Sequence, residues 1–523
     1  MRPIRHFLIA LAIALTSSAH AATFDLATAT IADINAAFDA GALTSEKLTQ
    51  LYLNRIDAYD QKGPAIKAFL YVNPNALSEA KALDAERKAK GPRSPLHGVC
   101  VVLKDVFDTK DMPTTGGFLP LKGVHPTKDA FVVKRLRDAG AIILGKLNQS
   151  DWYAQTEMTA ASTLGGNTKN PYDLTRIPGW SSAGTGAAIA AYFGTIGLGS
   201  ETGFSIRTPT SDSNLFGLST TSGLISRDGQ MWSYMTGERG GPMARSVYDL
   251  VATLDVIAGF DDNDLWTARS LGQMPPEKYL SFLKKDGLKG ARVGVLKDAY
   301  AFKPSTPEGI ELAAKSIKVF EDNGARVIYD LTLGIDLPAS ASLSGELGRF
   351  ERIHAINHYL SRQGPDYPFH NATELLLNHP EITPRPRDVQ QLKAPIDLNR
   401  DPEYRAALEF KAGLRQAVIE LMDKYHLDAL IYPHKLHGPL KIGRAGEPDR
   451  FYAPNQLSPI TGLPAFIVPS GFTPDGLPIG FEILGRPWSE PTLIKLASGF
   501  EAVTNNRRTP PFTPPLPGEH FDY

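Results

Sequence analysis

The chain is short of cysteine, of excess charge and of long apolar stretches, and each shortage excludes a class of protein. Cys100 is the only cysteine among 523 residues, so a disulfide framework within the chain and a cysteine-built metal or iron–sulfur site are both excluded. Lys and Arg number 55 against 56 Asp and Glu, which leaves a formal net charge of −1. This balance provides no general field for a polyanion, so we expect no nucleic acid partner.

The histidines give no metal-binding or catalytic pattern either. The 12 histidines are scattered, and no spacing among them suggests a catalytic partner. Histidine, cysteine and carboxylate residues also fail to cluster at the spacing of metal ligands. We therefore expect a protein that needs no metal ion and no other cofactor.

The first 21 residues have the layout of an export signal. Arg2 and Arg5 form a basic start, residues 7–15 form an apolar core, and Ala19, His20 and Ala21 form a small-x-small cleavage site. The apolar core is well short of the ~20 residues that a membrane-spanning helix needs. We expect cleavage after residue 21, release into the periplasm or the medium, and no stable membrane anchor.

Apolar runs of strand length alternate with helical periodicity along the rest of the chain. The apolar runs are 98–103, 141–144, 196–198, 293–296, 327–329 and 429–431, and the periodic segments are 31–38, 44–56, 131–139 and 310–320. This alternation predicts an α/β architecture in which helices cover a central sheet.

Two further segments do not follow this alternation of strands and helices. Residues 340–426 are rich in helix formers and are interrupted by proline clusters, which predicts a helical insertion. Residues 507–523 contain a proline-rich run that cannot be helical, so we expect an extended C-terminal strap. No internal repeat or long linker divides the chain, which favours one large domain over 22–523.

Glycine and serine gather between residues 165 and 210 around two serines of chemical interest. Ser181 lies in a glycine-rich turn that leads into a helix of small residues. Ser205 follows the apolar run 196–198, so it is expected on a loop at the end of a strand. Glycine-serine clusters are also typical of ordinary turns, and position alone does not separate the two readings.

A catalytic serine needs a base and needs donors for the oxyanion that its attack creates. Lysine serves as the base when burial lowers its pKa from about 10.4 towards ~7–8. Lys104 directly follows the apolar run 98–103, although a lysine at a strand end is often a solvated edge charge. The oxyanion donors would be the backbone N–H groups of Thr202, Gly203, Phe204 and Ser205. The residues alone therefore indicate a possible Ser–Lys hydrolase.

The order of these segments resembles the amidase-signature family, and the peptide amidases of that family most of all. The matching blocks are 95–105 with 111–115, 145–148 with 166–173, 178–205 with 240–246, and 462–465 with 475–480 and 485–487. The resemblance implies a mixed β-sheet covered on both faces by helices. It also implies hydrolysis of a carboxylic amide through an acyl-serine intermediate.

Carried over residue by residue, the resemblance assigns a triad. Ser205 becomes the nucleophile, Ser181 the bridging serine held by a cis peptide bond, and Lys104 the base. The substrate would be a small amide or a short peptide amide. Esters, urethanes and anilides stay open on the same triad, as does a catalytically silent binding protein. The export signal argues against a component of a tRNA-dependent amidotransferase, and the sequence leaves the oligomeric state open.

Several positions depart from the family pattern. Trp180 and Ala183 replace the glycines that usually flank the bridging serine, Phe204 replaces a glycine before the nucleophile, and Glu201 replaces aspartate. A Gly-to-Phe change at 204 keeps the backbone donor in place only if φ there is negative. Gly179, Trp180 and Phe204 are candidate substrate contacts, and the alternative is that the two aromatic rings only fill the core.

Overall fold

The structure is a computed structural model that describes residues 22–156, 160–340, 343–380, 382–443 and 455–523. The predicted export signal at residues 1–21 lies outside these ranges.

The described strands form one large mixed sheet and two small pairs. The strands are β1 (Thr23–Asp25), β2 (Phe69–Val72), β3 (Cys100–Lys104), β4 (Ile142–Leu147), β5 (Ala161–Ser162), β6 (Gly166–Asn167), β7 (Ile196–Glu201), β8 (Phe216–Ser219), β9 (Arg239–Ala244), β10 (Arg292–Leu296), β11 (Arg326–Leu331), β12 (Ala429–Pro433), β13 (Ala465–Phe472), β14 (Pro478–Leu484) and β15 (His520–Asp522).

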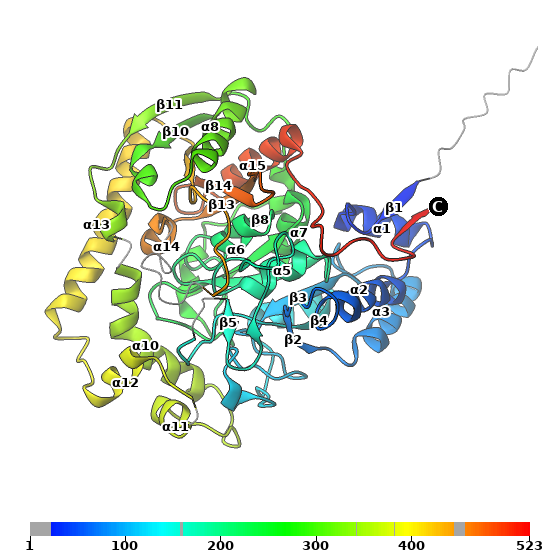
Figure 1. Cartoon of the computed structure of the whole chain (residues 1–523), viewed down its shortest axis with the longest axis horizontal. Coiled ribbons are helices and arrows are strands. Elements are labelled where there is room, and N and C mark those ends of the chain that lie inside the picture. The colour runs from blue at the N-terminus through cyan, green and yellow to red at the C-terminus, as the bar shows by residue number, and fades with distance from the viewer. Residues whose placement is uncertain (1–21, 157–159, 341–342, 381, 444–454) are drawn as a thin grey trace, which may run out of the picture.

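The large sheet places its strands in the order β11-β10-β12-β14-β13-β8-β9-β7-β3-β4-β2 (Figure 1). β3 runs parallel to β4 and β7, and β10 runs parallel to β11 and β12. The other neighbours in this sheet are antiparallel. Because β3 and β7 are parallel neighbours, their carboxyl ends meet at one edge of the sheet, and Lys104 and Glu201 lie there.

Helices cover both faces of this sheet. They are α1 (Ile31–Asp39), α2 (Ser45–Tyr59), α3 (Ala76–Lys90), α4 (Phe131–Asp138), α5 (Ala183–Ala190), α6 (Arg207–Asp212), α7 (Val247–Ile257), α8 (Pro307–Asp322), α9 (Leu337–Ser340), α10 (Leu343–Ser361), α11 (Ala372–Leu377), α12 (Pro386–Lys393), α13 (Pro402–Lys424), α14 (Leu457–Thr461) and α15 (Glu490–Thr504). Short 3-10 turns add η1 (Leu119–Leu121), η2 (Leu265–Ser270), η3 (Tyr279–Phe282) and η4 (Lys297–Ala301). The predicted α/β architecture is confirmed.

The glycine-rich and small-residue sequence around α5 allows this helix to lie very close to the central strands. A Cβ added to Gly197 in β7 would stand 2.4 Å from Cγ2 of Thr185 in α5. No larger residue fits between the two elements, because such a contact is far inside van der Waals distance. α5 also contacts β3 and α6, so the turns before these two helices are held over the edge where β3 and β7 end.

The segment between β11 and β12 forms α9 to α13, and it contains the range 340–426 in which the sequence predicts a helical insertion. α10 packs against α12 and α13. A small separate core joins these helices to the body of the protein, and it contains Tyr234, Leu347, Phe350, Tyr404 and Ala407. In Figure 1 α13 runs along the side of the molecule away from α1 to α3.

The proline-rich tail runs back to the start of the described chain. β15 pairs antiparallel with β1, with Phe521 opposite Phe24. Arg55 in α2 ties down the preceding turn through Glu519, at 2.8 Å, and through the carbonyl of Thr513, at 2.7 Å. The tail is therefore an extended strap closed by an ion pair.

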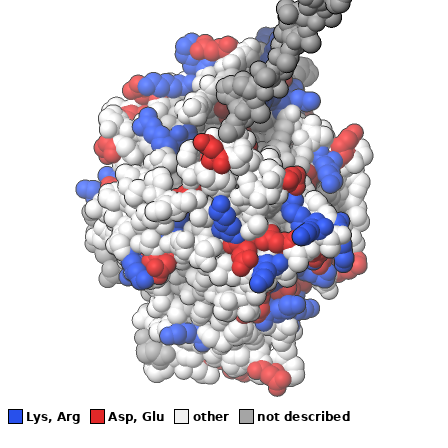
Figure 2. Space-filling view, turned by 90° about the vertical axis from the view of Figure 1, so that its right-hand side faces the viewer, with Lys and Arg blue, Asp and Glu red and all other residues white. Residues whose placement is uncertain are grey.

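Positive and negative side chains alternate over the face that Figure 2 shows, and no large area of one sign appears on it. None of the helices in the described ranges is both long and apolar enough to cross a bilayer.

Candidate active site

Lys104 is the last residue of β3, and its side chain is fully buried. Its Nζ forms hydrogen bonds with Oγ of Ser181 at 2.7 Å and with Oγ of Ser200 at 3.0 Å. The ring of Trp152 lies over the same nitrogen, 5.0 Å from ring centroid to Nζ. The lysine is thus shielded from bulk solvent and contacts two hydroxyl groups and an aromatic face.

This environment weakens the protonated form of the lysine. Burial lowers the pKa of Lys104 to about 7, even though the carboxylates of Glu238 and Glu201 favour the charged form. Burial also raises the pKa of Glu238, which hydrogen-bonds Ser200. A neutral amine able to accept a proton is therefore well populated near neutral pH.

Ser181 lies in the turn that leads into α5, and only 7% of its surface is exposed. The next residue, Ser182, fixes this turn to β7: its Oγ donates to the carbonyl of Ser200 at 3.1 Å and accepts from the N–H of Ser200 at 3.2 Å. The backbone carbonyl of Ser181 accepts from the N–H of Ser150 at 3.2 Å. Three contacts therefore hold Ser181 beside the end of β3.

Ser205 lies in the turn between β7 and α6 and is 5% exposed. Glu201, at the end of β7, accepts hydrogen bonds from the N–H groups of Ile206 and Arg207 at 3.1 and 3.0 Å. The Arg207 and Arg239 guanidinium groups overcome the effect of burial and keep the pKa of Glu201 below its usual value. Glu201 therefore stays ionised, and its two hydrogen bonds hold the turn that contains Ser205.

Arg207 connects this turn to the opposite half of the sheet. Its guanidinium is completely buried and contacts Glu201 at 2.9 Å and Glu482 of β14 at 2.8 Å. Burial alone would lower the pKa of Arg207, but the two carboxylates outweigh it and raise the pKa. Nη2 of the same residue donates to the carbonyl of Gly203 at 2.6 Å.

In the turn between β7 and α6, backbone N–H groups point away from the side chains of Arg207 and Tyr234. In a trans peptide the C=O and the following N–H point in opposite directions. The carbonyl of Gly203 is held by Arg207 and that of Thr202 by the Tyr234 hydroxyl at 3.1 Å, so the N–H groups of Gly203 and Phe204 face the other way. Within the described residues these two N–H groups and that of Ser205 have no protein acceptor.

The φ angle of Phe204 bears on this geometry. The φ angle of Phe204 is not positive. The condition for a backbone donor at this position, a negative φ, is therefore met despite the change from glycine.

The two serine-bearing turns contact each other. The rings of Trp180 and Phe204 meet edge to face with their centroids 4.5 Å apart. Gly179 has φ +107°, and a Cβ there would stand 2.6 Å from Cα of Pro209 in α6. Trp180 is half-buried and Phe204 is buried, so the pair forms a wall between the two turns.

The cis peptide bond expected at Ser181 is not present. Among the described residues the one cis bond is Lys303–Pro304. The hydrogen bond between Lys104 and Ser181 forms with the peptide before Ser181 in the trans state.

Sequence reasoning missed Ser200, Trp152 and Glu238, which all lie around Lys104. Ser200 could have been inferred, because the ends of parallel neighbouring strands meet and Ser200 is the penultimate residue of β7. Glu238 and Trp152 stand in no recognisable motif and far from Lys104 in the sequence, so only the folded chain brings them together. In the part of the chain that the structure describes, no cluster of His, Cys, Asp and Glu could hold a metal ion.

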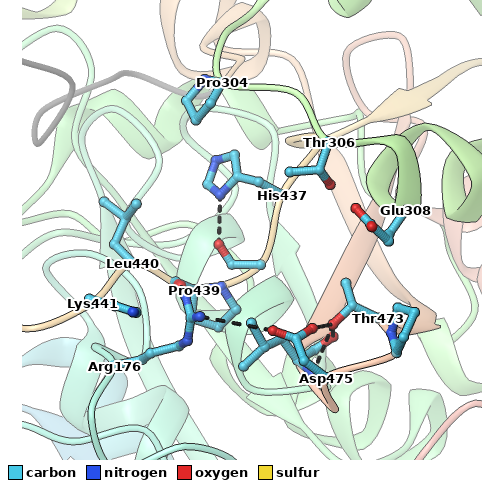
Figure 3. A pocket seen from close by; sticks show the side chains of 13 residues that line it. Arg176, Pro304, Thr306, Glu308, His437, Pro439, Leu440, Lys441, Thr473 and Asp475 are labelled. Carbon is cyan, nitrogen blue, oxygen red and sulfur yellow. Dashed lines mark hydrogen bonds and ion pairs between the residues drawn. The ribbon is translucent and has the colours of Figure 1, made fainter.

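A hollow of about 590 Å³ lies beside the segment that leads into the Ser181 turn (Figure 3). This segment is held there by the N–H of Ile177, which donates to the carbonyl of Leu440 at 2.9 Å. The lining of the hollow contains two basic residues, Arg176 and Lys441, and two acidic residues, Glu308 and Asp475. Lys104, Ser181 and Ser205 do not line it. Arg176 and Asp475 approach each other across its lower side at 3.9 Å. The balanced charges favour no particular ligand.

The fold and the buried lysine–serine cluster point to the class of serine hydrolases. Comparison with known proteins gives the family. The family model described as Amidase matches residues 47–494. The chain is 33% identical over 503 residues to a probable amidase of Arabidopsis thaliana, with 94% of this chain and 93% of the relative covered. It is 32% identical over 499 residues to a component of the glutamyl-tRNA(Gln) amidotransferase of Chloroflexus aggregans, with 91% and 96% covered.

Among solved structures, the native peptide amidase from Stenotrophomonas maltophilia superimposes with a TM-score of 0.82 at 34% identity, covering 93% of this chain and 99% of the other. The chain belongs to the amidase family. It is an enzyme that hydrolyses carboxylic amide C–N bonds.

Proposed function

We propose that Ser205 is the nucleophile, Ser181 the proton relay and Lys104 the base of this amidase. The observation that supports it best is the 2.7 Å hydrogen bond between Lys104 and Ser181, made by a lysine whose pKa is about 7. Neutral Lys104 takes the proton of Ser181 while Ser181 takes that of Ser205.

The reaction follows in two halves. Oγ of Ser205 bonds to the amide carbon, and the N–H groups from Thr202 to Ser205 receive the oxyanion. Loss of one such donor typically costs about 3–4 kcal/mol of transition-state stabilisation. The C–N bond then breaks as the proton returns to the leaving amine, and water attacks the acyl-serine to release a carboxylic acid.

We propose peptide amides as the preferred substrates. The similarity to the Stenotrophomonas maltophilia protein, a peptide amidase, supports this class. The wall of Trp180 and Phe204 supports it as well, because its aromatic faces suit an apolar or aromatic acyl group. Esters, urethanes and anilides are the alternatives on the same acyl-enzyme.

The test combines labelling with a substrate panel. A fluorophosphonate should label the wild-type protein and the Ser213→Ala variant, but it should not label Ser205→Ala. Ser213 is a matched control because it is buried and its Oγ has no partner among the described residues. Labelling of Ser205→Ala at the wild-type rate would show that another residue is the nucleophile.

The panel compares a peptide amide with the matching anilide, aryl ester and urethane of the same acyl group. We expect the highest kcat/KM for the peptide amide. A higher value for the ester or the urethane would overturn the substrate class while leaving the triad intact.

We also propose that the enzyme works outside the cytoplasm after its signal is removed. The arrangement of Arg2, Arg5, the apolar core and Ala21 supports export.

A further inference from the structure

A second cavity, of about 220 Å³, lies between α13, η2 and the end of α14. Its wall carries three cationic side chains, Arg269, Lys411 and Arg415, and no carboxylate. It thus differs from the hollow of Figure 3, whose charges are balanced. We propose that this cavity is a second binding site, separate from the serine cluster, for a small aromatic carboxylate.

The three cations are not paired with acids. Within the described residues no carboxylate lies within ion-pair distance of Arg269, Lys411 or Arg415. Burial and the nearby guanidinium of Arg269 lower the pKa of Arg415, and burial lowers the pKa of Lys411 to about 8. The Glu351 carboxylate favours the charged form of Lys411, but it makes no ion pair with any of the three cations. Neighbouring like charges without an ion-pair partner are stabilised when an anion binds between them.

The side chains are also held in place rather than loose. Lys411 donates to the carbonyl of Thr236 at 2.5 Å, and Nη1 of Arg415 donates to the carbonyl of Thr461 at 2.8 Å. The guanidinium of Arg269 lies 4.8 Å from the ring centroid of Trp266. Each anchor leaves further N–H groups on the cations for a ligand, and a guanidinium can hold a carboxylate with two parallel bonds.

The rest of the wall has an apolar part beside the hydroxyl-bearing residues Ser222, Thr236 and Thr461. Trp266, Leu408 and Ala412 line the cavity together with the cations. The Trp266 ring is fixed by its Nε1, which donates to Oγ of Ser222 at 2.9 Å. A bare inorganic anion would leave this apolar surface uncovered, whereas the ring of an aromatic acid buries it. The volume is below the ~300 Å³ at which pockets for drug-sized ligands begin, so the ligand is small.

The test measures benzoate binding by calorimetry. The proteins are wild type, Arg269→Met/Arg415→Met, and the control Arg405→Met, which removes an exposed arginine of the same helix α13. We expect wild type and the control to bind benzoate alike and the double variant to bind it at least about tenfold more weakly, since two charged hydrogen-bond donors are lost. Equal affinity of the double variant would place the bound benzoate elsewhere and overturn the proposal, as would no binding by wild type at millimolar benzoate.

Two further arms complete the test. Acetate and inorganic phosphate should bind at least about tenfold more weakly than benzoate, because neither fills the apolar wall. Phosphate that binds as tightly as benzoate would overturn the aromatic class. If the double variant does not fold, Arg269→Gln serves in its place. Arg269 is exposed, so this substitution leaves the packing intact, and unchanged benzoate affinity there would overturn the proposal.

Discussion

Two buried lysines lie near the ends of neighbouring strands, and they contact different partners. Lys146 of β4 lies 2.9 Å from the Asp105 carboxylate, so its positive charge is compensated. Lys104 of β3 contacts two serine hydroxyls instead. A buried cation without a contacting counter-charge loses its proton easily, and burial lowers the pKa of Lys104 to about 7. What lies next to each lysine, and not burial, which the two share, therefore favours Lys104 as the proposed base.

Glu238 should set the pH at which this base becomes active. Its negative charge raises the pKa of Lys104, so Glu238→Gln should lower that pKa further. Lys104 would then stay neutral at lower pH, and the acid limb of the kcat/KM profile should move down by about one pH unit or more. Glutamine can still accept the hydrogen bonds from Ser233 and Thr202.

Thr202→Val is the control for this prediction, because it removes a hydrogen bond of Glu238 and keeps the carboxyl group itself. Its acid limb should stay in place. An acid limb that does not move in Glu238→Gln, or one that moves upward, would show that Lys104 is not the group that titrates.

The non-additivity of the triad is a second test at the level of single residues. Lys104→Ala and Ser205→Ala should each lower kcat by roughly 10⁴-fold or more, and the double variant should be little worse than either. This pattern is expected because both residues serve one proton path. The measurement is the single-turnover rate with an amide substrate. If the loss in the double variant equals the product of the two single losses, the residues do not share one proton path.

At the level of elements, the turn before α5 depends on one glycine. Gly179→Ala would place a Cβ 2.6 Å from Pro209 at a φ of +107°. We expect a loss of more than about 1 kcal/mol in unfolding free energy. Displacement of the neighbouring Ser181 turn should also lower kcat by about 10²-fold.

Gly413→Ala in α13 is the control, since nothing lies within 4 Å of its added Cβ. It should leave kcat unchanged and raise stability slightly, because alanine favours a helix by up to ~1 kcal/mol over glycine. Both quantities follow from chemical denaturation and steady-state kinetics. Normal turnover by Gly179→Ala would show that the two turns are not coupled.

The C-terminal strap allows a second stability prediction at the level of elements. Arg55→Met leaves the Glu519 carboxylate buried without its partner, which should cost about 3–5 kcal/mol. The strap should then be cut by proteases after residue 505 while the core stays intact. The double variant Arg55→Met/Glu519→Met should recover much of the loss, because no unpaired charge remains. A double variant as unstable as the single one would mean that packing of Arg55, and not its charge, holds the strap.

At the scale of the whole molecule, the sequence predicted the parallel parts of the sheet far better than the antiparallel ones. β3, β4, β10 and β12 contain short apolar runs and are almost wholly buried, the pattern of strands covered on both faces. β11 contains the shorter run 327–329 and lies at the edge of the sheet, where most of its residues are exposed or half-buried. β9 and β14 contain glycine and proline, and their sequences, RGGPMA and PIGFEIL, match neither a strand pattern nor a helical one. Their pairing depends on partners distant in the chain, which local periodicity does not encode.

The candidate site was predictable to a similar degree. Lys104, Ser181 and Ser205 stand in segments with a recognisable pattern, and the structure holds Lys104 against Ser181. The ion-pair network of Arg207, Glu201 and Glu482 joins β7, α6 and β14, and no local feature of the sequence indicates it. Buried charges of this kind are compensated only by the complete fold.

The export proposed above concerns the whole chain. The N–H of Ala22 donates to the carbonyl of Tyr523 at 2.8 Å, and the N–H of Tyr523 donates back at 2.7 Å. Ala22 directly precedes β1, so removal of residues 1–21 would leave the pairing of β1 with β15 in place. When the full chain is expressed in a Gram-negative host, mass spectrometry of periplasmic protein should give a chain that begins at Ala22. Ala19→Arg/Ala21→Arg, which removes the small residues of the cleavage site, should block processing. Exported protein that retains Met1, or wild type found only in the cytoplasm, would contradict the export proposal without affecting the amidase assignment.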